Sequence, residues 1–309
     1  MNERIHKITD TLFFIQRGWL NGNHFVQARP DVVLVDAGYL PDWLETEDLI
    51  NQTGVRIEDT HHLILTHSHC DHVGGAADIA KRSGCQVSMH EVDRHFVNQC
   101  NDWATWWRYY GQEAAFFPVH RGLRDDDILT LGGLDWQVIH APGHGMGQIC
   151  LYAPDTGWLI SSDAAWDGDF GVLTTRIEGL DAPLRQAETL ARLARLNVTR
   201  MYPGHGPAIA DGREAIEKCR ERIAAFIEEP GRMATDQVRK IMLYVLMMHG
   251  PMTRNEFENR LTQSHWFPEV SSLYFNGNAQ TAFQDNLEYL VQRGLVRETE
   301  SGLACTLPS

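Results

Sequence analysis

Short apolar runs bounded by polar and turn residues recur through the first two thirds of the chain. Runs of this length predict buried β-strands, whereas apolar positions spaced three or four residues apart predict helices. We expect strands at residues 12–16, 24–28, 32–35, 63–66, 86–90, 136–139 and 158–162. Helices are expected at residues 42–53, 76–83 and 182–196, the last with leucines 184, 190, 193 and 196 facing the core. The pattern therefore predicts a domain of the α+β class.

The character of the chain changes after Pro230-Gly231, which divides it into residues 1–229 and a smaller part, 230–309. Helical patterns cover residues 213–228 and 235–249, and Thr253-Arg254-Asn255-Glu256 matches a capping box that opens a short helix. A further helix is expected at 278–293, followed by a small hairpin of residues 295–299 and 303–307.

Residues 93–127 are unusually rich in aromatic side chains. Trp103, Trp106, Trp107 and Tyr110 occur at positions i, i+3, i+4 and i+7, which is the spacing of one helix face. This face can pack on its own domain, line a substrate pocket as a lid, or form a dimer contact. As a lid it would present Trp103 and Trp107 to a substrate with an apolar or planar portion.

Composition and charge narrow the functional classes. The 309 residues suffice for one large and one small domain, and the net charge of −14 disfavours nucleic acid or an anionic membrane as partner. No apolar run approaches the ~20 residues of a membrane span, and the charged residues 1–10 do not resemble a secretory signal. The six cysteines form no Cys-x-x-Cys pair, so we expect reduced thiols and a cytoplasmic protein.

The segment Thr66–Gly75 carries the most informative chemistry. It places His67, His69, Asp71 and His72 within six residues, directly after a strand and before Gly74-Gly75, which give room for a tight bend. On extended backbone the first two histidines point to the same side, whereas the adjacent Asp71 and His72 diverge. One loop therefore offers two pairs of metal ligands.

This His-x-His-x-Asp-His pattern resembles the signature of the metallo-β-lactamase superfamily. The superfamily also needs a later His, a bridging Asp and a last His, and each is present after an expected strand or in a Pro-Gly-His segment. The resemblance implies two divalent metal ions, one held by His67, His69 and His144, the other by Asp71, His72 and His205, with Asp163 between them.

The resemblance also implies the architecture: a four-layer αβ/βα sandwich with the metals at one edge. Asp36, which ends the strand 32–35, would lie beneath the metal loop and hold the second ring nitrogen of a histidine ligand; otherwise it is a turn aspartate. Trp166 stands three residues after the bridging aspartate, where lactonases of the superfamily usually have Tyr, and would line the mouth of the site. The C-terminal part resembles the winged-helix domain of the β-lactamase-like protein 2 group.

The expected function is that of a dinuclear metal-dependent hydrolase, with Zn²⁺ first and Mn²⁺ or Fe²⁺ also suitable. A metal-bridging hydroxide would attack an ester, thioester, lactone or amide of a small metabolite with an apolar or aromatic part. Asp71 would act both as ligand and as catalytic proton carrier. In the usual Gly-His-Thr-x-Gly-His segment this chain has Gly145 and Gln148 at two positions, which can alter metal affinity or substrate position.

Two alternatives remain at this stage. One is a phosphodiester or RNA hydrolase, although residues 230–309 hold seven Lys/Arg against eight Asp/Glu, and we expect no nucleic acid as partner. The other is a non-catalytic, regulatory metal-binding protein that acts through its C-terminal part. We expect that part to cover the active site or to form a homodimer contact.

Overall fold

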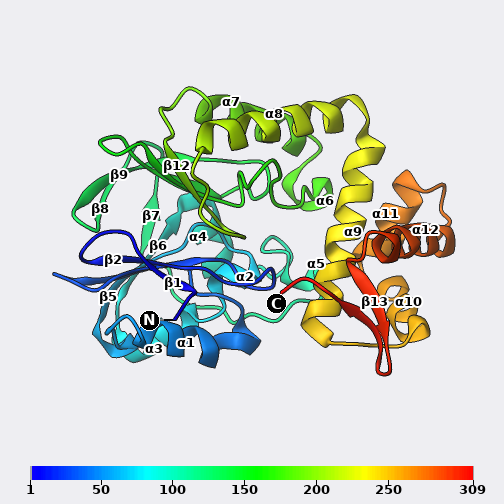
Figure 1. Cartoon of the computed structure of the whole chain (residues 1–309), viewed down its shortest axis with the longest axis horizontal. Helices are drawn as coiled ribbons and strands as arrows, with labels where there is room; N and C mark the ends of the chain where they lie inside the picture. Colours follow the sequence, from blue (N-terminus) through cyan, green and yellow to red (C-terminus); the bar gives the residue numbers. More distant parts are fainter. Residues whose placement is uncertain (1, 309) are drawn as a thin grey trace.

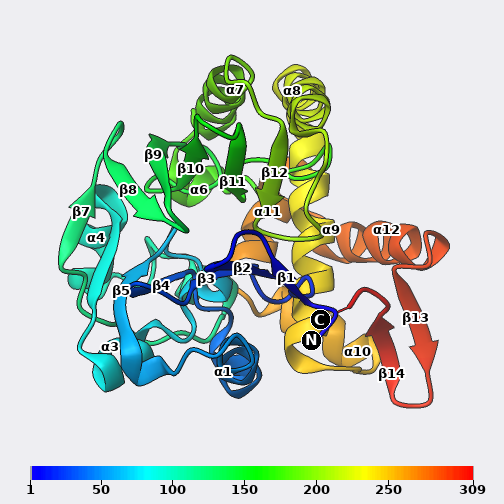
Figure 2. The ribbon, with the colours of Figure 1, turned by 60° about the vertical axis from the view of Figure 1, so that its left-hand side comes forward.

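The computed structural model describes residues 2–308, in which two large β-sheets pack face to face. Helices cover the outer face of each sheet, so helices, sheet, sheet and helices form four successive layers (Figure 1, Figure 2). The four-layer αβ/βα arrangement is therefore confirmed. Within the described residues, no helix combines the length and the apolar character needed to cross a membrane.

The first sheet has seven strands in residues 2–308, arranged in the order of the chain. The first four are antiparallel, and the remaining neighbours are parallel. The strands are β1 (Ile5–Lys7), β2 (Leu12–Ile15), β3 (His24–Gln27), β4 (Val32–Val35), β5 (Thr60–Ile64), β6 (Gln86–His90) and β7 (Arg121–Leu123). The connecting helices are η1 (Leu40–Asp42), α1 (Trp43–Asn51), η2 (Ile57–Asp59), α2 (Cys70–Val73), α3 (Ala76–Ser83), α4 (Glu91–Asn98) and α5 (Trp107–Tyr110).

The second sheet of the described chain has five strands in the order β12-β11-β10-β9-β8, and its parallel pair is β11 with β12. The strands are β8 (Ile128–Leu131), β9 (Leu134–His140), β10 (Ile149–Ala153), β11 (Trp158–Ser162) and β12 (Arg200–Pro203). The helices of this half are α6 (Thr175–Glu178), α7 (Ala182–Leu193) and α8 (Gly212–Glu228).

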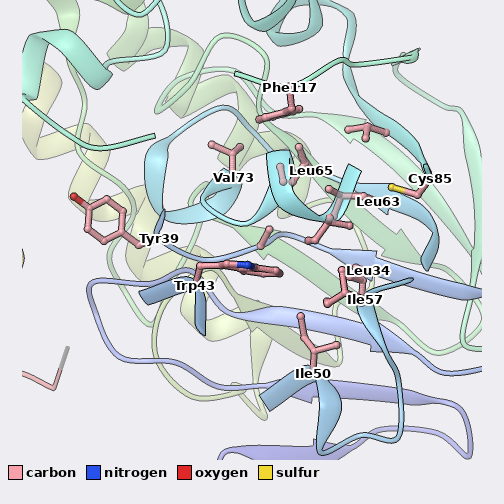
Figure 3. Packing of buried hydrophobic residues seen from close by; sticks show 14 of the residues in the cluster. Leu34, Tyr39, Trp43, Ile50, Ile57, Leu63, Leu65, Val73, Cys85 and Phe117 are labelled. Atoms are coloured by element: carbon pink, nitrogen blue, oxygen red, sulfur yellow. The ribbon is translucent and has the colours of Figure 1, made fainter. Parts of the chain in front are cut away.

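Side chains that alternate between the two faces of β4 show how the layers pack together. Val33 and Val35 point between the two sheets and pack in the same cluster as the fully buried Trp136 of β9. Leu34 points the other way, into the cluster beneath helices α1 and α3, near Ile50 and Leu63 (Figure 3). Because successive side chains of a strand lie on opposite faces, one strand supplies two separate hydrophobic layers.

The C-terminal part lies beside the open edge of the sandwich (Figure 1). Its elements are α9 (Pro230–His249), α10 (Arg254–Thr262), α11 (Trp266–Tyr274), α12 (Ala279–Gln292), β13 (Val296–Thr299) and β14 (Gly302–Cys305). The capping box is confirmed, because Thr253 Oγ1 accepts from the Glu256 amide and the Glu256 side chain accepts from the Thr253 amide. Several helices followed by a hairpin agree with the expected layout, and the winged-helix likeness itself remains a prediction.

One expected helix boundary and one expected helix face need correction, and one helix was missed. Helix α9 begins at Pro230 and not at residue 235, since proline is well suited to the first position of a helix. Helix α11 was not expected from the sequence, and its Pro268 lies within the first turn, where no intrahelical amide bond is lost. Leu184 is 54% exposed, so the buried stripe of α7 does not include it.

The aromatic segment does not form the expected helix face. Trp106 has a φ of 72°, and the helix that follows it, α5, contains four residues. Trp106, Tyr109 and Tyr110 pack in the hydrophobic cluster of the C-terminal helices, whereas Trp107 packs in the cluster of the first sheet. The segment therefore ties the C-terminal part to the sandwich.

Candidate metal centre

The residues expected to bind metals all follow strand ends on one edge of the sandwich. Strand β5 leads into His67 and His69, the backbone of His69 is extended, and helix α2 then starts at Cys70. Asp71 and His72 consequently lie in the first turn of α2, and the His72 ring lies 4.1 Å from the ring of His67 between their centroids. The later residues 144, 163 and 205 follow β9, β11 and β12.

Close packing explains several glycines around this edge. Gly74 has a helical φ of −53°, and a Cβ there would overlap the backbone of Tyr39 and Leu40. A Cβ on Gly75 would overlap the ring of Trp43. Residues 74 and 75 form the expected turn, between α2 and α3, and its close approach to η1 and to Trp43 leaves no room for a side chain. In the same way Gly22, Gly171 and Gly204 lie against His72, His144 and Asp163.

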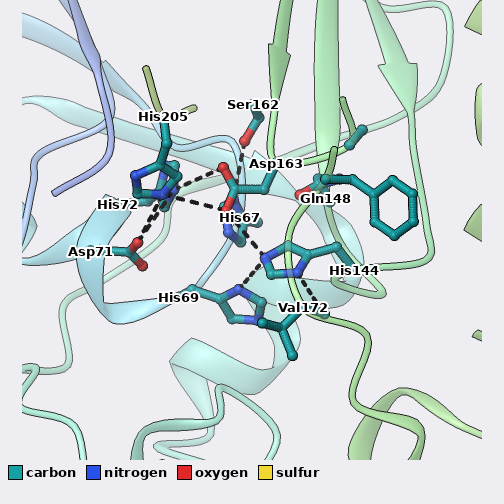
Figure 4. A network of polar contacts seen from close by, with 12 residues as sticks. His67, His69, Asp71, His72, His144, Gln148, Ser162, Asp163, Val172 and His205 are labelled. Atoms are coloured by element: carbon teal, nitrogen blue, oxygen red, sulfur yellow. Dashed lines mark hydrogen bonds and ion pairs between the residues drawn. The ribbon is translucent and has the colours of Figure 1, made fainter. Parts of the chain in front are cut away.

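The structure brings all seven side chains into one buried cluster (Figure 4). Their potential ligand atoms form three sets whose members lie within 4.8 Å of one another. The sets are His67, His69 and His144; His67, His72 and Asp163; and Asp71, His72 and His205. Two residues that are 75 positions apart, His69 and His144, approach to 2.8 Å between Nδ1 and Nε2.

Asp163 lies between the two histidine groups. Its Oδ1 is 3.5 Å from His72 Nε2, and its Oδ2 is 3.5 Å from Nε2 of both His144 and His205. On the far side, Asp71 Oδ2 is 3.1 Å from His205 Nε2. One carboxylate thus faces both groups of imidazoles, which is the arrangement of a bridging ligand.

The donor set fits two divalent metal ions. The buried Nε2 atoms of His67 and His72 have no hydrogen-bond partner among residues 2–308. A buried polar atom without a partner lowers the stability of the fold unless a ligand such as a metal ion binds it. Imidazole and carboxylate donors without thiolate suit Zn²⁺, Mn²⁺ or Fe²⁺.

Two acceptors fix the orientation of the histidine rings. Asp36, expected from the sequence beneath the metal loop, lies there with its Oδ2 2.8 Å from His72 Nδ1, and it also accepts hydrogen bonds from Thr66. The carbonyl oxygen of Val172 lies 2.6 Å from His144 Nδ1. In both rings Nδ1 is engaged, so Nε2 is directed to the centre of the cluster.

The electrostatics of the two groups differ. Burial lowers the pKa of His67 and His69 well below the usual value, so both rings are neutral at pH 7. Burial acts the same way on His205, but Asp163 and Asp71 outweigh it and raise its pKa to about 9. Metal binding to this second group therefore releases protons.

A cavity of about 900 Å³ opens onto the cluster. Three tryptophans form its wall at this end: Trp19 stacks on His205 with ring centroids 5.9 Å apart, and Trp166 meets the same ring at 5.2 Å. Trp106 lies over His69 at 3.8 Å. From there the cavity continues along one face of α9.

Of the three tryptophans expected to contact substrate, one lines the cavity and two do not. Trp166 lines the cavity, but Trp103 and Trp107 are not among the described residues that do so. Trp107 donates to the carbonyl oxygen of Ser68 at 2.9 Å, and Trp103 packs on Tyr109 with ring centroids 5.4 Å apart. The difference arises because the segment turns at residue 106 and does not continue as a helix.

Sequence reasoning missed two of the three tryptophans that line the cavity. Trp106 belongs to the aromatic run, whose assumed helical phase gave it no distinct role. Trp19 lies in the turn between β2 and β3, where no local sequence pattern indicates a cavity residue. Its position beside His205, 186 residues later, follows from the fold alone.

Comparisons with known proteins agree with this geometry. The family model described as Metallo-beta-lactamase superfamily matches residues 21–205. A hydroxyacylglutathione hydrolase from Rhodobacter capsulatus is 32% identical over 157 residues, covering 50% of this chain and 52% of that protein. Acyl-coenzyme A thioesterase MBLAC2 from Homo sapiens is 27% identical over 191 residues, covering 53% and 67%. The chain thus spans about half the length of the first curated relatives it matches.

A solved structure extends the likeness to the C-terminal part. The metallo-beta-lactamase family protein TTHA1429 from Thermus thermophilus superposes with a TM-score of 0.63. The alignment covers 97% of this chain and all of that one, at 21% identity. At this identity the likeness shows a shared fold that includes the helices after α8.

Proposed function

The chain belongs to the metallo-beta-lactamase superfamily, and on this premise we propose that it is a metal-dependent hydrolase of thioesters with an apolar or aromatic acyl part. The observation that carries the proposal is the buried cluster of five histidines and two aspartates at the end of an aromatic-walled cavity. The unpaired imidazole nitrogens lie where the cavity meets the cluster, so a molecule bound in the cavity would reach the metal site.

The metal ions are assigned to the residues by the three sets of ligand atoms. His67, His69 and His144 would hold one ion and Asp71, His72 and His205 the other, and Asp163, which lies 3.5 Å from His72, His144 and His205, would be available to both. Zinc is the first candidate, with manganese or iron also compatible with this donor set. When bound, such ions supply Lewis acidity and activate water for attack on a carbonyl group.

The side chains of the protein supply orientation, exclusion of water and a proton acceptor. Asp36 holds the ring of His72, and Trp106 and Trp166 cover the cluster on the cavity side. Asp71 also lines the cavity and is 8% exposed, so its carboxylate can take a proton from the attacking water and return it to the leaving thiolate.

No protein nucleophile is needed. Cys70, the thiol nearest to the cluster in sequence, is fully buried, and burial raises its pKa well above the usual value. Its Sγ lies 3.6 Å from the hydroxyl of Tyr244. A thiol in this environment is inert, so the chemistry rests on activated water.

Two observations favour thioesters over other acyl compounds. Both relatives named above act, by their names, on acyl derivatives of thiols: hydroxyacylglutathione and acyl-coenzyme A. The tryptophan wall suits an apolar acyl group next to the reacting carbonyl.

The test joins elemental analysis to a substrate panel. Metal-loaded protein is assayed on acyl-coenzyme A, S-acylglutathione, a lactone, a bis-aryl phosphodiester and an oligoribonucleotide. We expect two metal ions per chain and turnover of thioesters, lost in His144→Ala. Full metal occupancy without turnover of any panel member contradicts the proposal and favours a regulatory protein; turnover of phosphate esters alone favours a phosphodiesterase.

A further inference from the structure

The far end of the cavity is lined by charged side chains of both signs, with four cations and three carboxylates. From the metal cluster the cavity follows α9 to side chains of α8, α9 and α12, and its cationic lining residues are Arg222, Arg232, Arg239 and Lys240. The carboxylates that line the same end are Asp169, Glu229 and Asp236. The four cations differ in how they are paired.

Two of the cations are balanced within the fold. Arg222 Nε lies 2.9 Å from Asp169, and Lys240 Nζ lies 2.8 Å from Asp169 and 3.0 Å from Asp236. Two cations and two carboxylates form one compact network that joins α8, α9 and the loop between β11 and α6. These groups stabilise the junction of the two helices and have little charge left for a ligand.

Arg239 is different, because it makes no ion pair within residues 2–308. Its Nε donates to Asn286 Oδ1 at 2.9 Å, and its guanidinium lies 3.4 Å from the ring centroid of Tyr289. These neutral contacts fix the plane of the group while both terminal nitrogens remain free to donate. A fixed guanidinium with two free donors matches the geometry of a phosphate.

The position of Arg239 along α9 determines how far its guanidinium lies from the metal cluster. Tyr244 marks the metal end of the helix, since its hydroxyl contacts Cys70 of the metal loop. Arg239 lies five residues earlier, roughly 7.5 Å along the helix axis, and Arg232 roughly 18 Å. Both line the same cavity, so an elongated substrate can reach the metal cluster and the cations together.

We propose that Arg239 binds a phosphate group on the thiol part of the substrate, so that the substrate class is a thioester of a phosphorylated thiol. This inference rests on the proposed thioesterase function and names its substrate class. The acyl group lies against the tryptophan wall, and the thiol part extends along α9. Arg232, an exposed residue paired with Glu229 at 2.8 Å, lies at the outer end of this path.

The first experiment measures binding of the product thiols by calorimetry to the metal-loaded protein. The probes are coenzyme A, which carries phosphates, pantetheine, which has the same thiol arm without them, and glutathione, which carries carboxylates. We expect coenzyme A to bind more tightly than pantetheine, and Arg239→Ala to weaken coenzyme A binding about tenfold or more with pantetheine unchanged. Arg239→Lys keeps the charge without the planar fork and should give an intermediate loss.

The kinetic counterpart compares acyl-coenzyme A with the matching acyl-pantetheine. Arg239→Ala should raise KM for acyl-coenzyme A about tenfold and leave kcat little changed. For acyl-pantetheine, both KM and kcat should be unaltered. Arg297→Ala, an exposed arginine of β13 that is not among the cavity-lining residues, is the matched control and should alter neither. Thermal unfolding of each variant establishes that the fold is intact, and Arg239→Lys serves if the alanine variant unfolds.

The outcomes separate this inference from the proposed function. Equal binding of coenzyme A and pantetheine, or undiminished coenzyme A binding by Arg239→Ala, overturns the phosphate site while leaving the hydrolase intact. A loss confined to glutathione identifies a carboxylate as the anion and also overturns it. Arg239-dependent coenzyme A binding without hydrolysis of any thioester contradicts the proposed function but supports the binding site.

Discussion

The Nδ1 atom of His72 lies 2.8 Å from Oδ2 of Asp36, and both side chains are buried. Asp36 follows β4 with a φ of 61°, a left-handed conformation that Asp tolerates better than most residues. Its carboxylate also accepts from the amide and the hydroxyl of Thr66, each at 2.8 Å. The aspartate therefore joins the end of β4 to both ends of the metal loop and fixes the direction of His72 Nε2.

Asp36→Asn should weaken metal binding about 10- to 100-fold, because the amide cannot hold both His72 and Thr66 as the carboxylate does. The ion bound with His72 should be lost first. Competitive titration against a chromophoric chelator measures this. Asp31→Asn, an exposed aspartate just before the same strand, is the control. Wild-type affinity for both ions in Asp36→Asn would show that the contact does not support the metal centre.

Asp71→Ala should reduce turnover by more than its loss of metal explains. The side chain faces both His205 and the cavity, so it combines the position of a ligand with that of a proton acceptor. Metal content and kcat are measured on the same samples, and His205→Ala is the comparison because it removes a neighbouring ligand but no carboxylate. If activity per bound metal is equal in the two variants, Asp71 acts as a ligand alone.

Glu178 is a buried carboxyl group close to the cavity wall. Its Oε1 accepts from Trp106 Nε1 at 2.5 Å and its Oε2 accepts from the Met146 amide at 2.7 Å. Burial outweighs these hydrogen bonds and raises the pKa of Glu178 to about 8. The folded protein therefore holds this proton more tightly than the unfolded chain does.

The raised pKa of Glu178 makes the free energy of unfolding depend on pH. The stabilisation by protonated Glu178 is fully present below the unfolded pKa of about 4.5 and is lost as the pH rises to about 8. Denaturant unfolding of the wild type should therefore lose a few kcal/mol across this range relative to Glu178→Gln. Glu188→Gln, an exposed substitution on α7, should keep the wild-type slope. Parallel profiles for wild type and Glu178→Gln would contradict the raised pKa.

Local patterns were sufficient for much of the fold. The capping box at Thr253 and the strand Trp158–Ser162 depend on neighbouring residues, and both occur where the sequence places them. The alternation of Val33, Leu34 and Val35 similarly reports a strand buried on both faces. The layering of the two sheets was taken from the family resemblance, because periodicity does not determine how sheets stack.

The remaining features depend on contacts between distant segments. The spacing of Trp106 and Trp107 fits a helix, yet the hydrogen bond from Trp106 to Glu178 and the packing of Trp107 beneath the metal loop favour a turn between them. Trp19 and Arg239 gain their roles from elements far away in the chain, His205 and Asn286. No local pattern reports such pairs.

The neighbouring residues Trp106 and Trp107 offer a matched test of the cavity wall. Both are buried, at 3% and 4% exposure, but only the first of the two lies among the cavity-lining residues described. Replacing either ring by leucine removes buried aromatic surface, so both variants should lose stability, by about 1 kcal/mol or more. Stability alone therefore cannot distinguish a substrate contact from a packing residue.

The dependence of KM on the acyl group makes the distinction. Trp106→Leu should raise KM for a long or aromatic acyl thioester about tenfold relative to the acetyl thioester of the same thiol, because the ring over His69 forms the wall for the acyl group. Trp107→Leu should leave this ratio unchanged, since its ring packs on Phe116 and donates to the carbonyl oxygen of Ser68. The reverse pattern would restore Trp107 as the substrate residue that the aromatic spacing indicates. Equal ratios in both variants would place the acyl group elsewhere in the cavity, away from the wall above His69.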